Sequence, residues 1–171
     1  TATTPTYLSG LAYLNVASNR LSGQLPAAPQ LAAANFVSVH SNRLSGSLPA
    51  GLLHNLTEMR YLMLQRNALS GGVPSEIGRL VKLSGLAMYE NRLDLPLPEE
   101  LGDAILLNDL RLQSNRINGT IPESIGNLVR LRYLDLYDNQ MEGDIPPGIA
   151  NLTNLKELYV QNEHLTPVRQ R

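Results

Sequence analysis

The stretch IPESIGNLVRLRYLDLYDNQMEGD, Ile121 to Asp144, decides the fold. Its central segment YLDL alternates polar and apolar residues, which is typical of a short strand with one buried face. Leu134 and Leu136 are therefore expected to point inward, and Tyr133 and Asp135 outward. An asparagine, a glycine and a proline follow this segment in a fixed order, and that order recurs elsewhere in the chain.

Two markers of this stretch recur with one period, which is the signature of a repeat architecture. The asparagine of the phrase L-x-L-x-x-N returns at steps of 23, 25, 24, 24 and 24 residues, at Asn19, Asn42, Asn67, Asn91, Asn115 and Asn139. A proline returns at the same five steps, at Pro26, Pro49, Pro74, Pro98, Pro122 and Pro146. One unit cannot bury its own leucines, so the stack of units is expected to fold as a whole.

Each part of the unit has a physical role. The strands of successive units are expected to stack in parallel, about 4.8 Å apart. The asparagine amide can satisfy backbone groups of the adjacent turn, which would otherwise be buried and unpaired. Glycine allows a backbone conformation that other residues resist, and proline begins the return path, where its missing N–H is not needed. The I-G-x-L segment is expected to form a short helical turn.

The units resemble the plant-type leucine-rich repeat of 24 residues, on the elements LSGQLP, LSGSLP, LSGGVP, INGTIP and MEGDIP. The resemblance covers essentially the whole chain. It implies an α/β solenoid, a right-handed superhelix of about seven repeats. A parallel β-sheet would line its concave face, and 3₁₀ or short helical turns its convex face. Similar repeats form the ectodomains of receptor-like kinases and polygalacturonase-inhibitor-type proteins. Residues 1–171 are expected to be a single repeat domain.

Several units depart from the pattern. The return path of the second repeat carries a second proline, Pro29, and is one residue short, whereas that of the third repeat is one residue longer. Leu95 stands where the fourth repeat should have glycine, which predicts a local change of backbone course. Glu163 occupies the last asparagine position. The resemblance implies cysteine-bearing terminal caps, and because the chain has no cysteine we expect a fragment that lacks them.

The outward strand positions are rich in aromatic residues. Six of the seven tyrosines and the only phenylalanine fall on them. Tyrosine is favoured at binding interfaces, because it offers a large area, few rotatable bonds and a polar tip. A general preference of aromatic residues for strands is the other explanation. The candidate partner-binding residues are Tyr61, Tyr89, Asp109, Arg111, Tyr133, Asp135, Tyr137, Asp138, Glu157 and Tyr159.

Charge among these residues suggests a partner. Four carboxylates of repeats 5 to 7 are set against the single cation Arg111. One interpretation is an anionic, tyrosine-rich patch that suits a protein or peptide with Lys or Arg beside an apolar anchor. The other is an ordinary solvated face on which Arg111 pairs with a neighbouring acid.

The leading functional hypothesis is a module that recognises a protein or peptide on the concave face, as the resemblance implies. The alternatives are a structural subunit of a larger assembly and a carbohydrate-binding surface that uses the tyrosines. The net charge of −1 gives no reason to expect nucleic acid. No apolar run approaches the roughly 18 residues of a membrane span. Nothing proposes an enzyme, a cofactor or a metal site, since His40, His54 and His164 are far apart in the stack of repeats and none has metal-ligand spacing.

Three N-glycosylation sequons begin at Asn55, Asn118 and Asn151. All three are expected to lie off the concave face, where glycans would not block it. They favour an extracellular or cell-surface glycoprotein, although N-L-T and N-G-T also arise from the repeat pattern itself. The alternative location is a large intracellular assembly.

Overall fold

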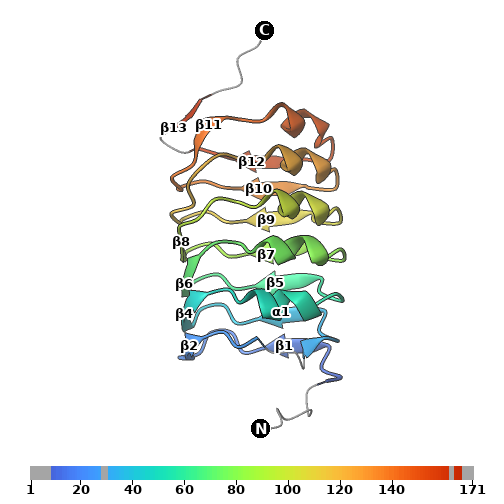
Figure 1. Ribbon diagram of the computed structural model, residues 1–171, viewed down its shortest axis with the longest axis vertical. Helices are drawn as coiled ribbons and strands as arrows, with labels where there is room; N and C mark the ends of the chain where they lie inside the picture. Colours follow the sequence, from blue (N-terminus) through green and yellow to red (C-terminus); the bar gives the residue numbers. More distant parts are fainter. Residues whose placement is uncertain (1–8, 28–30, 162–163, 167–171) are drawn as a thin grey trace.

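A computed structural model describes residues 9–27, 31–161 and 164–166. One three-residue strand from each repeat joins a parallel seven-stranded sheet, and Figure 1 shows these strands as successive rungs of a stack. In spatial order the strands are β1 (Tyr13–Asn15), β3 (Phe36–Ser38), β5 (Tyr61–Met63), β7 (Gly85–Ala87), β9 (Asp109–Arg111), β10 (Tyr133–Asp135) and β12 (Glu157–Tyr159). Spatial order follows chain order, which confirms the predicted solenoid.

A second row of parallel strands runs along another edge of the stack, and the sequence analysis did not predict it. It arises from the segments around the repeat glycines. Four of its strands form one sheet: β2 (Ser22–Gln24), β4 (Arg43–Ser47), β6 (Ala68–Gly71) and β8 (Arg92–Leu93). Two more pair separately, β11 (Glu142–Asp144) with β13 (His164–Thr166).

Five return paths contain a short helical turn that starts after the repeat proline. Four are five-residue 3₁₀ helices: η2 (Ser75–Arg79), η3 (Glu99–Asp103), η4 (Glu123–Asn127) and η5 (Pro147–Asn151). The third repeat instead forms the six-residue α-helix α1 (Ala50–Asn55). The extra residue of that repeat is therefore absorbed as a wider turn, in which Leu52 and Leu53 are both buried.

The repeat asparagines join neighbouring rungs, as predicted. The Nδ2 group of Asn67 donates to the main-chain oxygens of Val39, Leu64 and Gln65 at 3.1, 3.1 and 3.4 Å. Its Oδ1 atom accepts the N–H of Leu44 at 3.0 Å. Each of these side chains thus satisfies backbone groups of two repeats. Asn42, Asn91, Asn115 and Asn139 form the same set of bonds.

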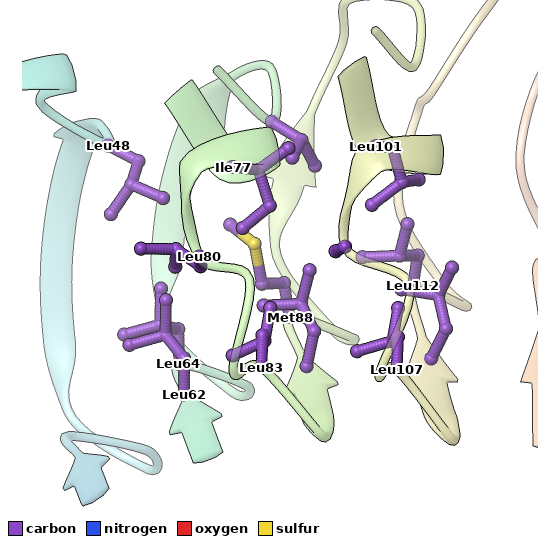
Figure 2. Packing of buried hydrophobic residues seen from close by; sticks show 14 of the residues in the cluster. Leu48, Leu62, Leu64, Ile77, Leu80, Leu83, Met88, Leu101, Leu107 and Leu112 are labelled. Carbon is purple, nitrogen blue, oxygen red and sulfur yellow. The ribbon is translucent and has the colours of Figure 1, made fainter. Parts of the chain in front are cut away.

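The core is a continuous column of leucines between the strands and the helical turns. Figure 2 shows Leu62 and Leu64 of one rung beside Leu83 and Met88 of the next. Leu134 and Leu136 have no exposed area, which confirms their predicted inward direction. Every repeat contributes to one core, so stability spreads along the stack as in other solenoids.

The fourth repeat changes course where the sequence predicted it. Leu95, in place of glycine, is 54% exposed, and β8 is only two residues long. Among the described residues no strand of the second row follows until β11. Five other repeats have glycine with positive φ at this position, namely Gly23, Gly46, Gly71, Gly119 and Gly143. The predicted irregularities at Pro29 and Glu163 lie outside the described residues.

Candidate functional site

The exposed side of the seven-stranded sheet, hereafter the sheet face, carries two rows of side chains. The strand register places Tyr13, Phe36 and Tyr61 side by side in the first row. The rings of Tyr13 and Phe36 stack with 4.3 Å between their centroids, and those of Phe36 and Tyr61 lie 6.3 Å apart. Aromatic side chains therefore pack on one another along the first three rungs.

This aromatic row ends at a hollow in the fourth rung. Its floor is made by Gly85 and Ala87, both buried, where the neighbouring rungs carry Tyr61 and Met63. The ring of Tyr61 leans over Gly85, since a Cβ atom added there would lie 2.8 Å from Tyr61 Cδ1. The hollow has a volume of about 250 Å³ and is lined by Met63, Gln65, Gly85, Leu86, Ala87, Tyr89, Asp109 and Arg111.

The far wall of the hollow is a fixed cation. The Nε and Nη2 atoms of Arg111 donate to the two carboxylate oxygens of Asp109 at 2.8 and 3.0 Å. The guanidinium carbon lies 4.2 Å from the ring centroid of Tyr133, within cation–π range. The hydrogen bonds that Arg111 donates to Asp109 raise the pKa of Arg111, although partial burial opposes this. Arg111 and Asp109 thus neutralise one another. This agrees with the interpretation in which Arg111 pairs with a neighbouring acid.

Two buried acceptors on the sheet face have no hydrogen-bond partner among the described residues, namely Gln65 Oε1 and Gln113 Oε1. Gln65 lines the hollow. Leaving a buried acceptor unpaired costs roughly 1–3 kcal/mol. Beside the hollow, Arg66 pairs with Glu90 at 3.1 Å, and that hydrogen bond raises the pKa of Arg66.

Repeats 6 and 7 form a second group on the sheet face. The rings of Tyr133 and Tyr159 lie 5.7 Å apart, and the Tyr159 hydroxyl donates to Glu157 at 3.2 Å. This hydrogen bond is the main cause of a raised pKa of Tyr159, and burial raises the pKa of Tyr133. Tyr137 is 51% exposed.

Asp135 differs from the prediction that it points into solvent. It lies on the sheet face but is only 7% exposed, because its neighbours cover it. Its Oδ1 atom accepts the main-chain N–H of Tyr137 at 3.1 Å. Burial raises the pKa of Asp135, although that hydrogen bond and the charge of Arg111 oppose the effect. Asp138 is exposed and has a left-handed backbone with φ of 55°.

The structure therefore divides the predicted binding residues into two groups. Tyr61, Tyr89, Asp109 and Arg111 surround the hollow, and the others lie on repeats 6 and 7. The sequence analysis missed the floor and side of the hollow, which are Met63, Gln65, Gly85 and Ala87. The signal was available, since glycine and alanine replace large residues at the outward positions of one strand only.

Comparison with known proteins supports the repeat assignment directly. The family model described as leucine rich repeat matches residues 105–165. The described residues before this segment form rungs with the same strand, and those of repeats 3 and 4 have the same asparagine bonds and helical turn. The chain is a plant-type leucine-rich repeat protein. No curated protein matches its sequence.

Solved structures similar to this leucine-rich repeat protein include plant receptors. A structure described as a TDR receptor has 34% identity and a TM-score of 0.86, over 96% of this chain and 28% of that one. The PEPR1–AtPEP1 structure has 32% identity and a TM-score of 0.85, over 96% and 23%. The ectodomain of the Arabidopsis receptor kinase HAESA, in complex with an extended IDA peptide hormone, has 32% identity and a TM-score of 0.86. The match covers 92% of this chain and 26% of that one. The repeat protein thus spans about a quarter of the length of these relatives.

The three sequons of the repeat protein lie away from the sheet face. Asn55 ends α1 and Asn151 ends η5, both in the row of helical turns. Asn118 precedes Gly119, and its Nδ2 group donates to the main-chain oxygen of Asp94 at 3.0 Å. Glycosylation at these residues remains a prediction.

Two searches of the described part of the repeat protein gave no site. No three His, Cys, Asp or Glu side chains there are grouped so that they could hold a metal ion. No helix in those residues has the length and apolar character needed to cross a membrane.

Proposed function

We propose that this chain is a recognition module that binds a protein or peptide on the sheet face, with one partner side chain in the hollow. The observation that carries the proposal is the hollow itself. It interrupts a row of packed side chains, and its walls are held by the Arg111–Asp109 ion pair and the Tyr61 ring. A preformed recess of this kind is where binding energy concentrates at interfaces.

The lining of the hollow indicates the chemistry of its occupant. Its volume of about 250 Å³ suits one large side chain rather than a drug-sized ligand. Met63 and Ala87 offer an apolar surface, while the Asp109 carboxylate, whose side chain is 37% exposed, can accept a further hydrogen bond. The matching side chain has an apolar body and an N–H or O–H donor at its tip, as in tryptophan or tyrosine.

Repeats 6 and 7 add a preference for positive charge. Asp109 is already paired with Arg111 and Asp135 is buried, which leaves Asp138 and Glu157 as the exposed carboxylates of this part of the sheet face. A partner with Lys or Arg next to the residue in the hollow would meet these carboxylates. Tyr137, more than half exposed, would cover the aliphatic part of that side chain.

The similar solved structures support this class of function. One of the three, HAESA, is described as a receptor kinase ectodomain in complex with a peptide hormone. By the same likeness we infer an extracellular or cell-surface location and a role in recognition rather than catalysis. The partner of this chain is proposed by chemical class alone, since the chain spans about a quarter of those relatives.

A peptide library displayed on phage tests the proposal. The library is selected on the wild-type chain and counter-selected on Ala87→Phe, whose ring would fill the hollow. We expect enriched peptides that compete with one another and share an aromatic residue beside Lys or Arg. Enrichment of peptides that bind both proteins equally would overturn the proposal, because their site would then lie elsewhere.

A further inference from the structure

A basic groove lies on the flank of the stack and borders the sheet face at Tyr61. It has a volume of about 420 Å³ and is lined by Arg60, Tyr61, Lys82, Ser84, Leu106, Asn108, Arg130, Arg132 and Asn154. Neither aspartate nor glutamate lines it. Four cations thus gather in one place on a chain whose net charge is −1, so the positive charge is segregated.

Backbone hydrogen bonds fix the order of these residues along the flank. The N–H of Ser84 donates to the oxygen of Arg60, that of Asn108 to Ser84, and that of Arg132 to Asn108, at 2.8 to 2.9 Å. Arg60 and Arg132 are therefore three rungs apart, which at the spacing of parallel strands is about 14 Å. Lys156 continues the row by one rung, since its N–H donates to Arg132 at 2.9 Å.

The cations of the basic groove are largely available to a partner. Among the described residues the guanidinium groups of Arg60, Arg130 and Arg132 form no salt bridge, and all three residues are exposed. Lys82 is paired with Glu58 at 2.7 Å, but that pair is itself about half exposed. Exposed pairs of this kind contribute little and exchange readily.

An apolar ridge adjoins the basic groove. Val81, Ile105 and Val129 are 52%, 53% and 46% exposed, and they recur at the 24-residue period of the repeat. Each immediately precedes a groove residue, namely Lys82, Leu106 and Arg130. Three exposed β-branched side chains in a row beside a charged groove are typical of an interaction surface.

We propose that the basic groove binds an extended acidic peptide segment of a partner protein, at a surface that meets the proposed sheet-face site at Tyr61 but does not include the hollow. An extended chain rises about 3.3 Å per residue, so carboxylates at positions i and i+4 are about 13 Å apart and meet Arg60 and Arg132. Ser84 and Asn108, between them, hydrogen-bond the peptide backbone. An apolar side chain of the segment packs on the Val81–Ile105–Val129 ridge, which an anion without apolar groups would leave uncovered.

The test uses the 171-residue chain and a fluorescein-labelled peptide with glutamates at i and i+4 and a leucine between them. A second peptide has glutamine at both positions. Fluorescence anisotropy is measured at about 50 mM and about 500 mM salt. We expect the acidic peptide to bind at low salt, to weaken at high salt, and to bind more tightly than the glutamine peptide by about tenfold or more.

Matched variants assign the binding to the groove. The double variant Arg60→Gln, Arg132→Gln should weaken binding of the acidic peptide about tenfold, and Arg130→Gln alone should weaken it severalfold. The double variant Arg92→Gln, Arg116→Gln removes two exposed arginines outside the groove and should change the affinity less than about twofold. The melting temperature of each variant verifies its fold, and Ala87→Phe should leave this affinity unchanged, so this proposal and the sheet-face proposal fail separately.

Three results would overturn the proposal. Equal weakening in both double variants would mean that overall charge attracts the peptide. Equal binding of the glutamine peptide would mean that the carboxylates are not recognised. Dextran sulfate that binds in dependence on Arg60 and Arg132, with no binding of the peptide, would assign the groove to a sulfated polymer instead.

Discussion

Arg111 lies over the ring of Tyr133, with 4.2 Å between the guanidinium carbon and the ring centroid, while the same guanidinium group holds Asp109 through two hydrogen bonds. One side chain thus joins the far wall of the hollow to the aromatic pair of repeats 6 and 7. The two groups of candidate binding residues are connected through this contact, which makes Arg111 the first residue to test.

Replacing Arg111 by methionine should lower the free energy of unfolding by about 1 kcal/mol, because the cation–π contact and the charge partner of Asp109 are both lost. Arg66→Met is the matched control, since Arg66 also has an acid and a tyrosine beside it, but at 5.8 Å from the Tyr89 ring and with more exposure. Urea denaturation measures the free energy of unfolding of both variants. An equal decrease in the two would contradict the special role given to Arg111.

Asn91→Ala should be far more destabilising than its exposure suggests. Its side chain donates to three main-chain oxygens and accepts the N–H of Leu69, and alanine would leave these backbone groups without partners. We expect a loss of about 3 kcal/mol. Asn19 has the same place in its repeat but bonds only within its own turn, so Asn19→Ala should cost less than about 1 kcal/mol. Thermal unfolding of Asn91→Ala and Asn19→Ala compares the losses of stability that the two changes cause.

Alanine should have opposite effects at two glycines. Gly71 has φ of 75°, and an added Cβ would lie 3.3 Å from Ser47 Cβ, so Gly71→Ala should destabilise the protein by about 1–2 kcal/mol. Gly51 lies inside α1 with Ala27 Cβ at 3.5 Å, so Gly51→Ala should be neutral or stabilise by up to about 1 kcal/mol. Loss of stability at both positions would show that space, rather than backbone conformation, limits these sites.

Asp135→Asn should raise stability at neutral pH. Burial raises the pKa of Asp135 in the folded protein above its ordinary value of 3.8, so the charged form is less favourable in the folded than in the unfolded state. This penalty is present above the folded pKa and disappears as the pH falls below 3.8. The variant should therefore melt on the order of 1 °C higher at pH 7, with no difference near pH 3. A lower melting temperature at pH 7 would contradict the assigned cause.

Much of the architecture could be predicted from the sequence because its cause is periodic. The asparagine and proline markers located every rung, and alternation in the YLDL segment identified Leu134 and Leu136 as core. The extra residue before Leu56 and the leucine at position 95 predicted where the stack becomes irregular. These features depend on local geometry within one repeat, which a single repeat already encodes.

The features that were missed depend on contacts between repeats. The burial of Asp135 follows from side chains one rung away, so alternation within its own strand could not reveal it. The residues before the repeat asparagines, such as Arg66 and Glu90, have φ of 57° and 53°, although neither arginine nor glutamate favours this left-handed conformation. The hydrogen bonds from their N–H groups to the next rung hold them there.

The most direct test of sheet-face recognition is the dissociation constant of a selected peptide for the wild-type chain and for Ala87→Phe, measured by isothermal titration calorimetry. Ser22→Phe places the same ring on β2, outside the sheet face, and is the control. We expect Ala87→Phe to weaken binding about a hundredfold and Ser22→Phe to leave the dissociation constant within about twofold. An unchanged dissociation constant for a correctly folded Ala87→Phe protein would contradict the claim that a partner side chain occupies the hollow.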